Sequence, residues 1–325
     1  MIKAVEAIFT MLLLFGAGAF LYKLGWVSEP VMGFISKFVV KFSVPCMMVW
    51  NLTNMFTHEE LVGMLPIIPL PLLMLLVLYA LSWCFAILCK VPRYRRGVFT
   101  LMAVVSNTMF IGFPVSLIVY GDASVPAVTV TFLSSTIVCW TIGISGLSHD
   151  ARCLSENGCN GPVPHYTAAQ RLKKVVTTPP LVALVVGVVL AALNLRLPTP
   201  LNNALSYVGG MTTPLSMLYI GMFLATVPLR EMIPAKASWE VFFCRFLLAP
   251  VLMVLFIILG RRLGIVVDKL SADVLIVQMG MPVMAQAVIL ATNLGCDAKF
   301  AARTTAASNV LFLLTFPLTL FLLGS

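Results

Sequence analysis

Charged residues are scarce in this chain, and acidic residues are absent from the centres of its long apolar runs. Only 10% of the 325 residues are charged, whereas 60% are hydrophobic. A soluble domain carries about 25% charged residues. The composition therefore excludes an ordinary soluble protein. It predicts an all-α polytopic membrane protein, because the apolar runs are long enough for about ten transmembrane helices.

The sequence also lacks the motifs of several function classes. Its eight Cys include no CxxC pair and no Cys/His cluster at metal-ligand spacing, so we expect no metal site and no cofactor. A Walker A motif is missing, as is a nucleophile–base pair within the spans, so we do not expect an enzyme. The net charge of +9 lies in short loops without interleaved aromatics, which argues against nucleic acid as a partner. Whether Cys153 and Cys159 pair stays open.

One polar stretch, residues 148–177, divides the apolar runs into five before it and five after it. We therefore predict a first repeat over 1–147, a cytoplasmic loop over 148–177 and a second repeat over 178–325. Five is an odd number, so the second repeat enters the membrane from the opposite side. With the N-terminus outside, twelve Lys and Arg fall in cytoplasmic loops and five in outer ones. The positive-inside rule favours this orientation, which places both termini outside.

Two apolar runs, 104–121 and 277–295, are interrupted by amides, Gly and Pro. In hydrocarbon, every backbone group that a break releases needs a new partner. Breaks at corresponding positions in two repeats are typical of a transporter's binding site near the bilayer midplane. Asn107 and Pro282 occupy such positions, each about 15 Å into its span at 1.5 Å per residue. We predict that spans 4 and 9 are a pair of broken helices.

The second halves of these helices would begin in mid-membrane, with free N–H groups and roughly half a positive charge at each end. Two such ends can bind an anion without a charged side chain. Pro282 suits the first position of its half-helix, because it has no N–H to leave unpaired. The predicted substrate-binding residues are Asn107, Thr108, Gly112, Gln278, Gly280, Pro282 and Gln286. Secondary candidates are Ser106, Pro114, Ser135, Arg303, Ser308 and Asn309.

Several of these residues have a purely structural alternative. Asn107 and Gln278 could be interhelical hydrogen-bond partners. Gly112 and Pro114 could be ordinary residues of membrane helices, where Gly and Pro are common.

Ionisable residues divide between the span ends and the loops. A proton or sodium antiporter would need carboxylates at the crossing, and the sequence offers amides there instead, so an anionic substrate fits better than a cation. Arg303 could attract anions to a cytoplasmic vestibule or extend to the interface. Arg245 is expected to form a local ion pair with Glu240.

Four stretches resemble the auxin efflux carrier family of membrane transporters. SNTMFIGFPVSLIVYG (106–121) is similar to the family's fourth helix and VQMGMPVMAQAVILA (277–291) to its ninth. GFISKFVVKFSVPCMMVW (33–50) resembles the second helix and TFPLTLFLL (315–323) the last. The resemblance covers nearly the whole chain.

This resemblance implies two inverted five-helix repeats whose helices 4 and 9 cross at their breaks. It also implies that transport helices 3–5 and 8–10 move in an elevator-like way against scaffold helices 1, 2, 6 and 7, which could form a homodimer. Plant members carry a proline where this chain has Ser106, and their central loop is longer. These departures favour a compact member of a bacterial inner membrane and argue against inferring auxin as substrate.

We therefore expect a bilayer-embedded, secondary active or potential-driven transporter of small organic anions. The substrates would be mono- or dicarboxylates, such as malonate-, malate- or auxin-like acids, with Na⁺ or H⁺ coupling left open. A cation (Na⁺/H⁺) antiporter or a channel of related fold is the alternative.

Overall fold

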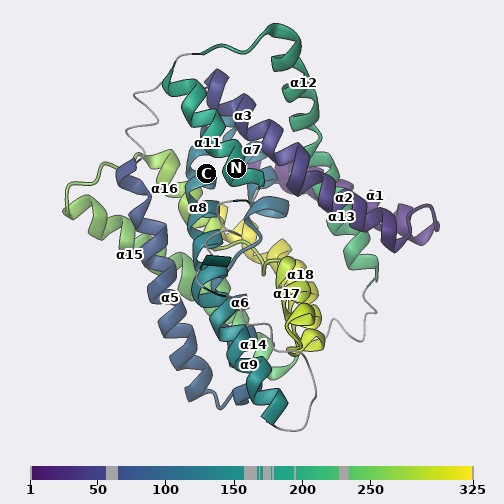
Figure 1. Ribbon diagram of the computed structural model, residues 1–325, viewed down its shortest axis with the longest axis vertical. Helices are drawn as coiled ribbons and strands as arrows, with labels where there is room; N and C mark the ends of the chain where they lie inside the picture. Colours follow the sequence, from purple (N-terminus) through teal and green to yellow (C-terminus); the bar gives the residue numbers. More distant parts are fainter. Residues whose placement is uncertain are drawn as a thin grey trace.

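The computed structural model describes residues 2–55, 65–156, 179–193, 195–226 and 234–323, together with 167, 169, 170 and 177. These residues form helices and connecting turns, without a β-strand (Figure 1). Six of the described helices are long and apolar enough to cross a membrane, and three shorter apolar helices accompany them. The predicted all-α polytopic membrane fold is confirmed.

The described helices group into the ten predicted spans. In the first half they are α1 (Ile2–Lys23); α2 (Glu29–Phe38), a π-helical segment (Val39–Ser43) and α3 (Val44–Met55); α5 (Pro69–Leu88); α6 (Arg96–Val104), a π-helical segment (Thr108–Gly112) and α7 (Phe113–Tyr120); and α8 (Val125–Val138), a π-helical segment (Cys139–Gly143) and α9 (Ile144–Glu156). In the second half they are α11 (Pro179–Ala192); α12 (Thr199–Gly210) and α13 (Thr212–Thr226); α14 (Lys236–Phe242), a π-helical segment (Phe243–Leu248) and α15 (Ala249–Arg262); α16 (Lys269–Met279) and α17 (Gln286–Asn293); and α18 (Ala298–Leu323).

Reciprocal contacts interlock the two halves of the chain. Span 1 packs along α13 of span 7, and span 6 packs along α3 of span 2. Gly18 lies against the Leu218 backbone in the first pair, and Gly187 lies against Leu52 in the second. Missing side chains let membrane helices approach closely. This exchange of equivalent pairs supports the predicted repeats, whose inverted orientation stays a prediction.

The buried apolar side chains form two clusters. The larger cluster is built mainly from α5, α6, α8, α15 and α16. The smaller cluster joins spans 1, 2, 6 and 7 to the second half of span 4, to Val277 and Met281 of span 9 and to the end of α18. Spans 1, 2, 6 and 7 thus share a core with both broken spans, along an interface of apolar side chains such as Phe110 and Tyr219, whose ring centroids are 5.2 Å apart.

Span 5 extends beyond the predicted boundary at residue 147, because α9 continues to Glu156. The extension has a packing reason. Asp150 is fully buried, and its two carboxylate oxygens accept hydrogen bonds of 2.8 Å from the backbone N–H groups of Gly97 and Val98. It therefore caps the N-terminus of α6, where a negative charge is favoured. The remainder of the predicted central loop lies largely outside the described residues.

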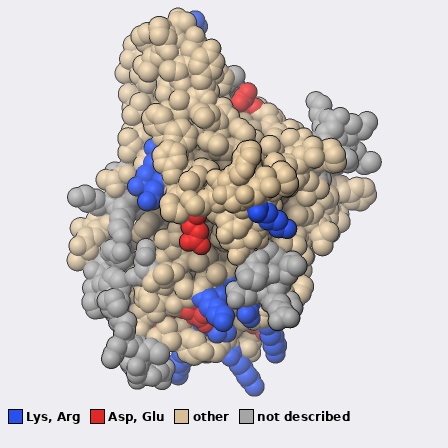
Figure 2. Space-filling view, turned by 90° about the vertical axis from the view of Figure 1, so that its right-hand side faces the viewer, with Lys and Arg blue, Asp and Glu red and all other residues tan. Residues whose placement is uncertain are grey.

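The surface matches a lipid-embedded protein. Figure 2 shows a face that is mostly uncharged, with several Lys and Arg side chains projecting together from its lower part. Large apolar side chains such as Trp26, Leu88 and Val266 are more than 75% exposed. In water such exposure would be costly, whereas in a bilayer the lipid covers these groups.

The close approach of α1 and α13 makes a testable prediction about stability. A Cβ atom at Gly18 would lie 2.1 Å from the Leu218 carbonyl oxygen, whereas one at Gly16 would have no atom within 4 Å. We expect Gly18→Ala to destabilise the protein by about 1–3 kcal/mol, as overpacking does. Gly16→Ala on the same helix is the matched control. Thermal unfolding in detergent measures both, and equal midpoints would contradict the packing.

Candidate functional site

Spans 4 and 9 are both broken, as the sequence predicts. In span 4, α6 ends at Val104, and helix resumes at Thr108. In span 9, α16 ends at Met279, and α17 begins at Gln286. The predicted placement of Pro282 at the first position of a half-helix is wrong, because Pro282 lies in the extended segment between the two halves.

The two breaks satisfy each other's backbone groups. Ser106 and Val283 form an isolated antiparallel bridge. Within it, Asn107 N–H donates to the Pro282 carbonyl over 2.8 Å, and Met284 N–H donates to the Val105 carbonyl over 3.2 Å. Spans 4 and 9 therefore cross at their breaks. A backbone group left unpaired in hydrocarbon costs several kcal/mol, so this exchange makes the irregular segments tolerable.

Ser308 of α18 supports the crossing from a third helix. Its hydroxyl accepts a hydrogen bond from Val283 N–H over 3.2 Å and donates one to the Thr305 carbonyl over 2.7 Å. Asn309 is buried beside it, and its Nδ2 also donates to Thr305, over 3.0 Å. These two secondary candidates therefore lie on α18, where Ser308 contacts the break of span 9 and neither residue lines the cavity.

Arg245 stabilises the two helix ends on the other side of the crossing. It is fully buried within the π-helical segment of span 8. Its Nη1 donates to the carbonyls of Val104 and Ala103, over 2.5 and 3.2 Å. Its Nε and Nη2 donate to the Met279 carbonyl. The last carbonyls of α6 and α16 are thereby satisfied by one guanidinium.

The expectation of a local ion pair between Arg245 and Glu240 is therefore wrong. The ion pairs among the described residues do not include it. The reason is geometric: helix C-termini carry roughly half a negative charge each, and two of them converge on Arg245. No local sequence pattern indicates this role, because the bonded carbonyls lie at least 34 residues away in the chain.

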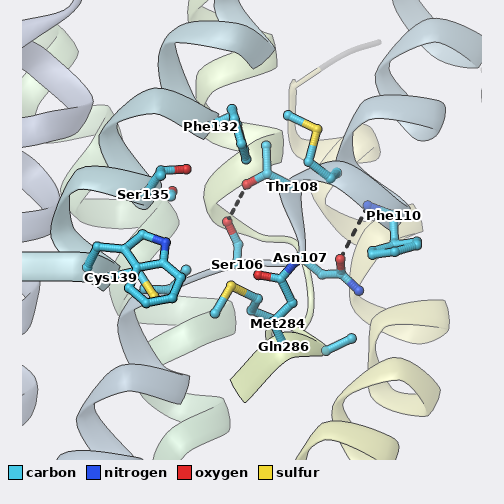
Figure 3. Close-up of a pocket in the computed structure, with 14 residues that line it drawn as sticks. Ser106, Asn107, Thr108, Phe110, Phe132, Ser135, Cys139, Met284 and Gln286 are labelled. Carbon is cyan, nitrogen blue, oxygen red and sulfur yellow. Dashed lines mark hydrogen bonds between the residues drawn. The ribbon is translucent and has the colours of Figure 1, made fainter. Parts of the chain in front are cut away.

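A cavity of about 50 Å³ lies beside the crossing, at the N-terminal starts of the second halves of spans 4 and 9 (Figure 3). Its lining comes from the crossing and from span 5. The lining residues are Val105, Ser106, Asn107, Thr108, Met109, Phe110, Phe132, Ser135, Thr136, Cys139, Trp140, Met284, Ala285 and Gln286. A water molecule needs about 10–15 Å³ of such space, so the cavity has room for a few waters or a small polar group.

The polar groups of the cavity converge from three segments. Asn107 caps the second half of span 4, since its Oδ1 accepts from Phe110 N–H over 3.3 Å. The hydroxyls of Ser106 and Thr108 are 3.2 Å apart. The Ser135 hydroxyl of α8 is buried and has no hydrogen-bond partner among the described residues. Figure 3 shows the Ser135 and Thr108 hydroxyls facing the same space.

The structure brings five predicted residues together at this cavity, namely Ser106, Asn107, Thr108, Ser135 and Gln286. Gln286 opens α17, so both half-helix N-termini reach the cavity. The cavity also has an apolar side that sequence reasoning did not assign. It is formed by the span 5 residues Phe132, Cys139 and Trp140 together with Met284.

Gln278 and Gly112 are not in the cavity lining and contact each other instead. Gln278 is fully buried, and its Nε2 donates to the Ser116 hydroxyl over 2.9 Å. A Cβ atom at Gly112 would lie 2.2 Å from the Gln278 Oε1. These contacts pack span 9 against span 4. In this structure Gln278 is therefore an interhelical hydrogen-bond partner, as the structural alternative proposes.

The remaining candidates also lie outside the cavity lining. Gly280 is the C-cap of α16, and Pro114 lies in the first turn of α7. The Pro282 carbonyl is occupied by Asn107 in the crossing. Arg303 of α18 is partly buried, and its Nε has no hydrogen-bond partner among the described residues.

Crossed broken helices whose second halves begin at a small polar cavity are typical of membrane transporters. The comparison with known proteins agrees. A family model described as "Membrane transport protein" matches residues 3–320, so the chain belongs to this family of transporters, the auxin efflux carrier family that its motifs resemble. The chain is also 24% identical, over 96% of each protein, to an "Uncharacterized transporter" of Methanothermobacter thermautotrophicus. The protein therefore acts in a lipid bilayer on a small-molecule substrate.

The Gln278–Ser116 hydrogen bond can be tested by a double-mutant cycle. Gln278→Ala, Ser116→Ala and the double variant should show a coupling free energy of about 0.6 kcal/mol and at most about 1.7 kcal/mol, the mean and the maximum measured for interhelical hydrogen bonds in a membrane protein. Unfolding free energies in mixed micelles give the value. Additive effects of the two substitutions would contradict the contact.

Proposed function

We propose that this protein is a carrier of small organic anions that binds a carboxylate of its substrate in the cavity beside the crossing. The observation that carries this proposal is the convergence of two half-helix N-termini on a cavity with an unpaired hydroxyl. The Ser135 hydroxyl is buried and lacks a hydrogen-bond partner among the described residues, and the Asn107 side chain lines the same cavity. A buried donor without a partner costs about 1–3 kcal/mol, so a ligand that accepts a hydrogen bond from Ser135 would recover that cost.

The chemistry of the cavity favours an anion over a cation. Its lining contains hydroxyls, amides and backbone N–H groups, and none of its residues is acidic. Cation-coupled sites in membranes rely on carboxylates, and the described residues contain no cluster of three or more His, Cys, Asp or Glu that could hold a metal ion. The apolar side of the cavity suits the carbon skeleton of a mono- or dicarboxylate.

The two apolar clusters support an elevator-type movement. In this proposal spans 3–5 and 8–10 carry the cavity, and spans 1, 2, 6 and 7 form the scaffold. The contact between them consists of apolar and aromatic side chains such as Phe110, Tyr219 and Phe316. The ion pairs among the described residues do not join these two groups of spans, and an apolar interface can slide at low cost. Because the cytoplasm is negative, moving a unit anion outward is favoured by about 2.3 kcal/mol per 100 mV, so efflux needs no coupling ion.

Two substitutions test the binding site. Proteoliposomes would be assayed with ¹⁴C-labelled malonate, malate, lactate and indole-3-acetate. For each acid that the wild type moves, Asn107→Ala and Ser135→Ala should raise the half-saturating concentration about 10- to 150-fold, the equivalent of a charge-assisted hydrogen bond worth about 1.5–3 kcal/mol.

Ser134 is the matched control for Ser135, and Asn54 is the matched control for Asn107. Ser134 neighbours Ser135, but its hydroxyl bonds to the Val130 carbonyl over 2.9 Å and it is not among the cavity residues. Asn54 is an exposed amide bonded to Asn202 over 2.8 Å. Ser134→Ala and Asn54→Ala should leave flux unchanged. Saturable flux at wild-type affinity in both site variants would reject the site, and single-channel currents would reject a carrier.

A further inference from the structure

We propose that Arg245 gives the unloaded substrate site a permanent charge of +1, so that a bound monoanion makes the crossing and its ligand together electrically neutral. This inference rests on the proposed anion transport and on the elevator-type movement. It concerns a residue that lies outside the cavity and acts through the helix ends that form it. Arg245 is thus a positioning residue that also sets the charge.

The charge balance follows from the four helix ends at the crossing. The C-termini of α6 and α16 contribute about −0.5 each, and the N-termini of the second halves contribute about +0.5 each. These partial charges cancel. Arg245 is fully buried and bonded to Ala103, Val104 and Met279 through their carbonyls alone. The crossing is therefore left with about one positive charge.

No other described side chain offsets this charge at the crossing. The described ion pairs of spans 3–5 and 8–10 lie away from the crossing. Arg95 lies 2.6 Å from Asp297, and Lys269 lies 3.9 Å from Asp273. The buried carboxylate of Asp150 lies 3.5 Å from His149 and is bonded to the first turn of α6, at the opposite end of that helix from Val104. Span 3 is the counterpart of span 8 in the first repeat. Its helix, α5, has no charged residue between Pro69 and Leu88. The guanidinium is thus supplied from one repeat alone.

The fork of the guanidinium explains why the residue is an arginine. One nitrogen reaches the end of α6, and two others reach the end of α16. A lysine ammonium has the same charge but lacks the planar fork. Arg245→Lys should therefore keep the electrical behaviour of the site while loosening the crossing, whereas Arg245→Gln removes the charge.

The consequence is a specific pattern of voltage dependence. When the site is loaded with a monoanion, the crossing and its ligand carry no net charge, and the membrane potential exerts no net force on them. When the site is empty, the crossing carries about +1, and a cytoplasm-negative potential pulls it toward the cytoplasm. The potential would thus return the empty site to the side where metabolic anions are abundant.

The test is exchange of labelled for unlabelled substrate in proteoliposomes, with saturating lactate or malonate on both sides and potentials of 0 and 100 mV set by K⁺ and valinomycin. Only the loaded carrier moves in this assay. In the wild type, lactate exchange should not change with potential. Malonate, a dianion at pH 7.5, leaves a net −1, and its exchange should fall about threefold if this charge crosses the full field over a symmetric barrier.

Arg245→Gln should shift this pattern by one charge. Lactate exchange should now fall about threefold at 100 mV, and malonate exchange should fall about 25-fold, by the same Boltzmann factor. Arg245→Lys should keep the wild-type pattern even where its rates are lower. Each rate is compared with the rate of the same variant at 0 mV, so a merely structural defect cancels.

The outcomes separate the two proposals. Wild-type protein that exchanges no carboxylate would overturn the proposed function, and this inference with it. Carboxylate exchange whose voltage dependence is the same in wild type and Arg245→Gln would overturn the inference alone. If Arg245→Gln does not fold, the wild type alone tests the inference. Wild-type lactate exchange that falls with potential as much as malonate exchange would contradict a site charge of +1.

Discussion

The structure depends on one constraint, namely that no backbone polar group can stay unpaired in hydrocarbon. Two spans violate the regular helix in mid-membrane, and each break releases N–H and C=O groups where water cannot reach them. The breaks solve the problem together. The extended segments around Ser106 and Val283 exchange hydrogen bonds across the crossing, and Arg245 binds the last carbonyls of both first halves. The second halves of both spans begin at the cavity, where the buried Ser135 hydroxyl has no hydrogen-bond partner among the described residues.

This arrangement assigns opposite tasks to the two sides of the crossing. The C-terminal side is closed, buried and saturated by a guanidinium, so it serves as the fixed anchor of the crossing. The N-terminal side is lined by Asn107, Ser135 and Gln286, with polar groups still available to a ligand. A carrier needs such a division, because the site must stay intact while the body that contains it moves. The π-helical segments of spans 4, 5 and 8 all lie at this level of the structure, as π-bulges at functional sites often do.

Much of this architecture was readable from the sequence, and the reason is that membranes restrict the possible folds. Long apolar runs in a membrane form helices, so the ten spans follow from the composition. The breaks near Asn107 and Pro282 follow from the amides, Gly and Pro that interrupt two of the runs. Side-chain direction did not follow. Gln278 and Asn107 are both amides beside a break, yet Gln278 turns toward Ser116 and Asn107 borders the cavity. Rotation about the helix axis decides between these outcomes, and packing against spans 5 and 10 sets that rotation. Arg245 was misjudged for a related reason, since its partners are carbonyls more than 30 residues away that no local pattern reveals.

The central claim is that a carboxylate occupies the cavity where the second halves of spans 4 and 9 begin. The most direct measurement is anomalous diffraction from crystals grown with 3-bromopropionate, whose bromine marks the ligand. The account predicts an anomalous peak beside the apolar wall of Phe132 and Trp140, with the carboxylate within hydrogen-bond distance of Asn107 and Ser135. A peak confined to the protein surface, or bound ligand on the Arg245 side of the crossing, would contradict it.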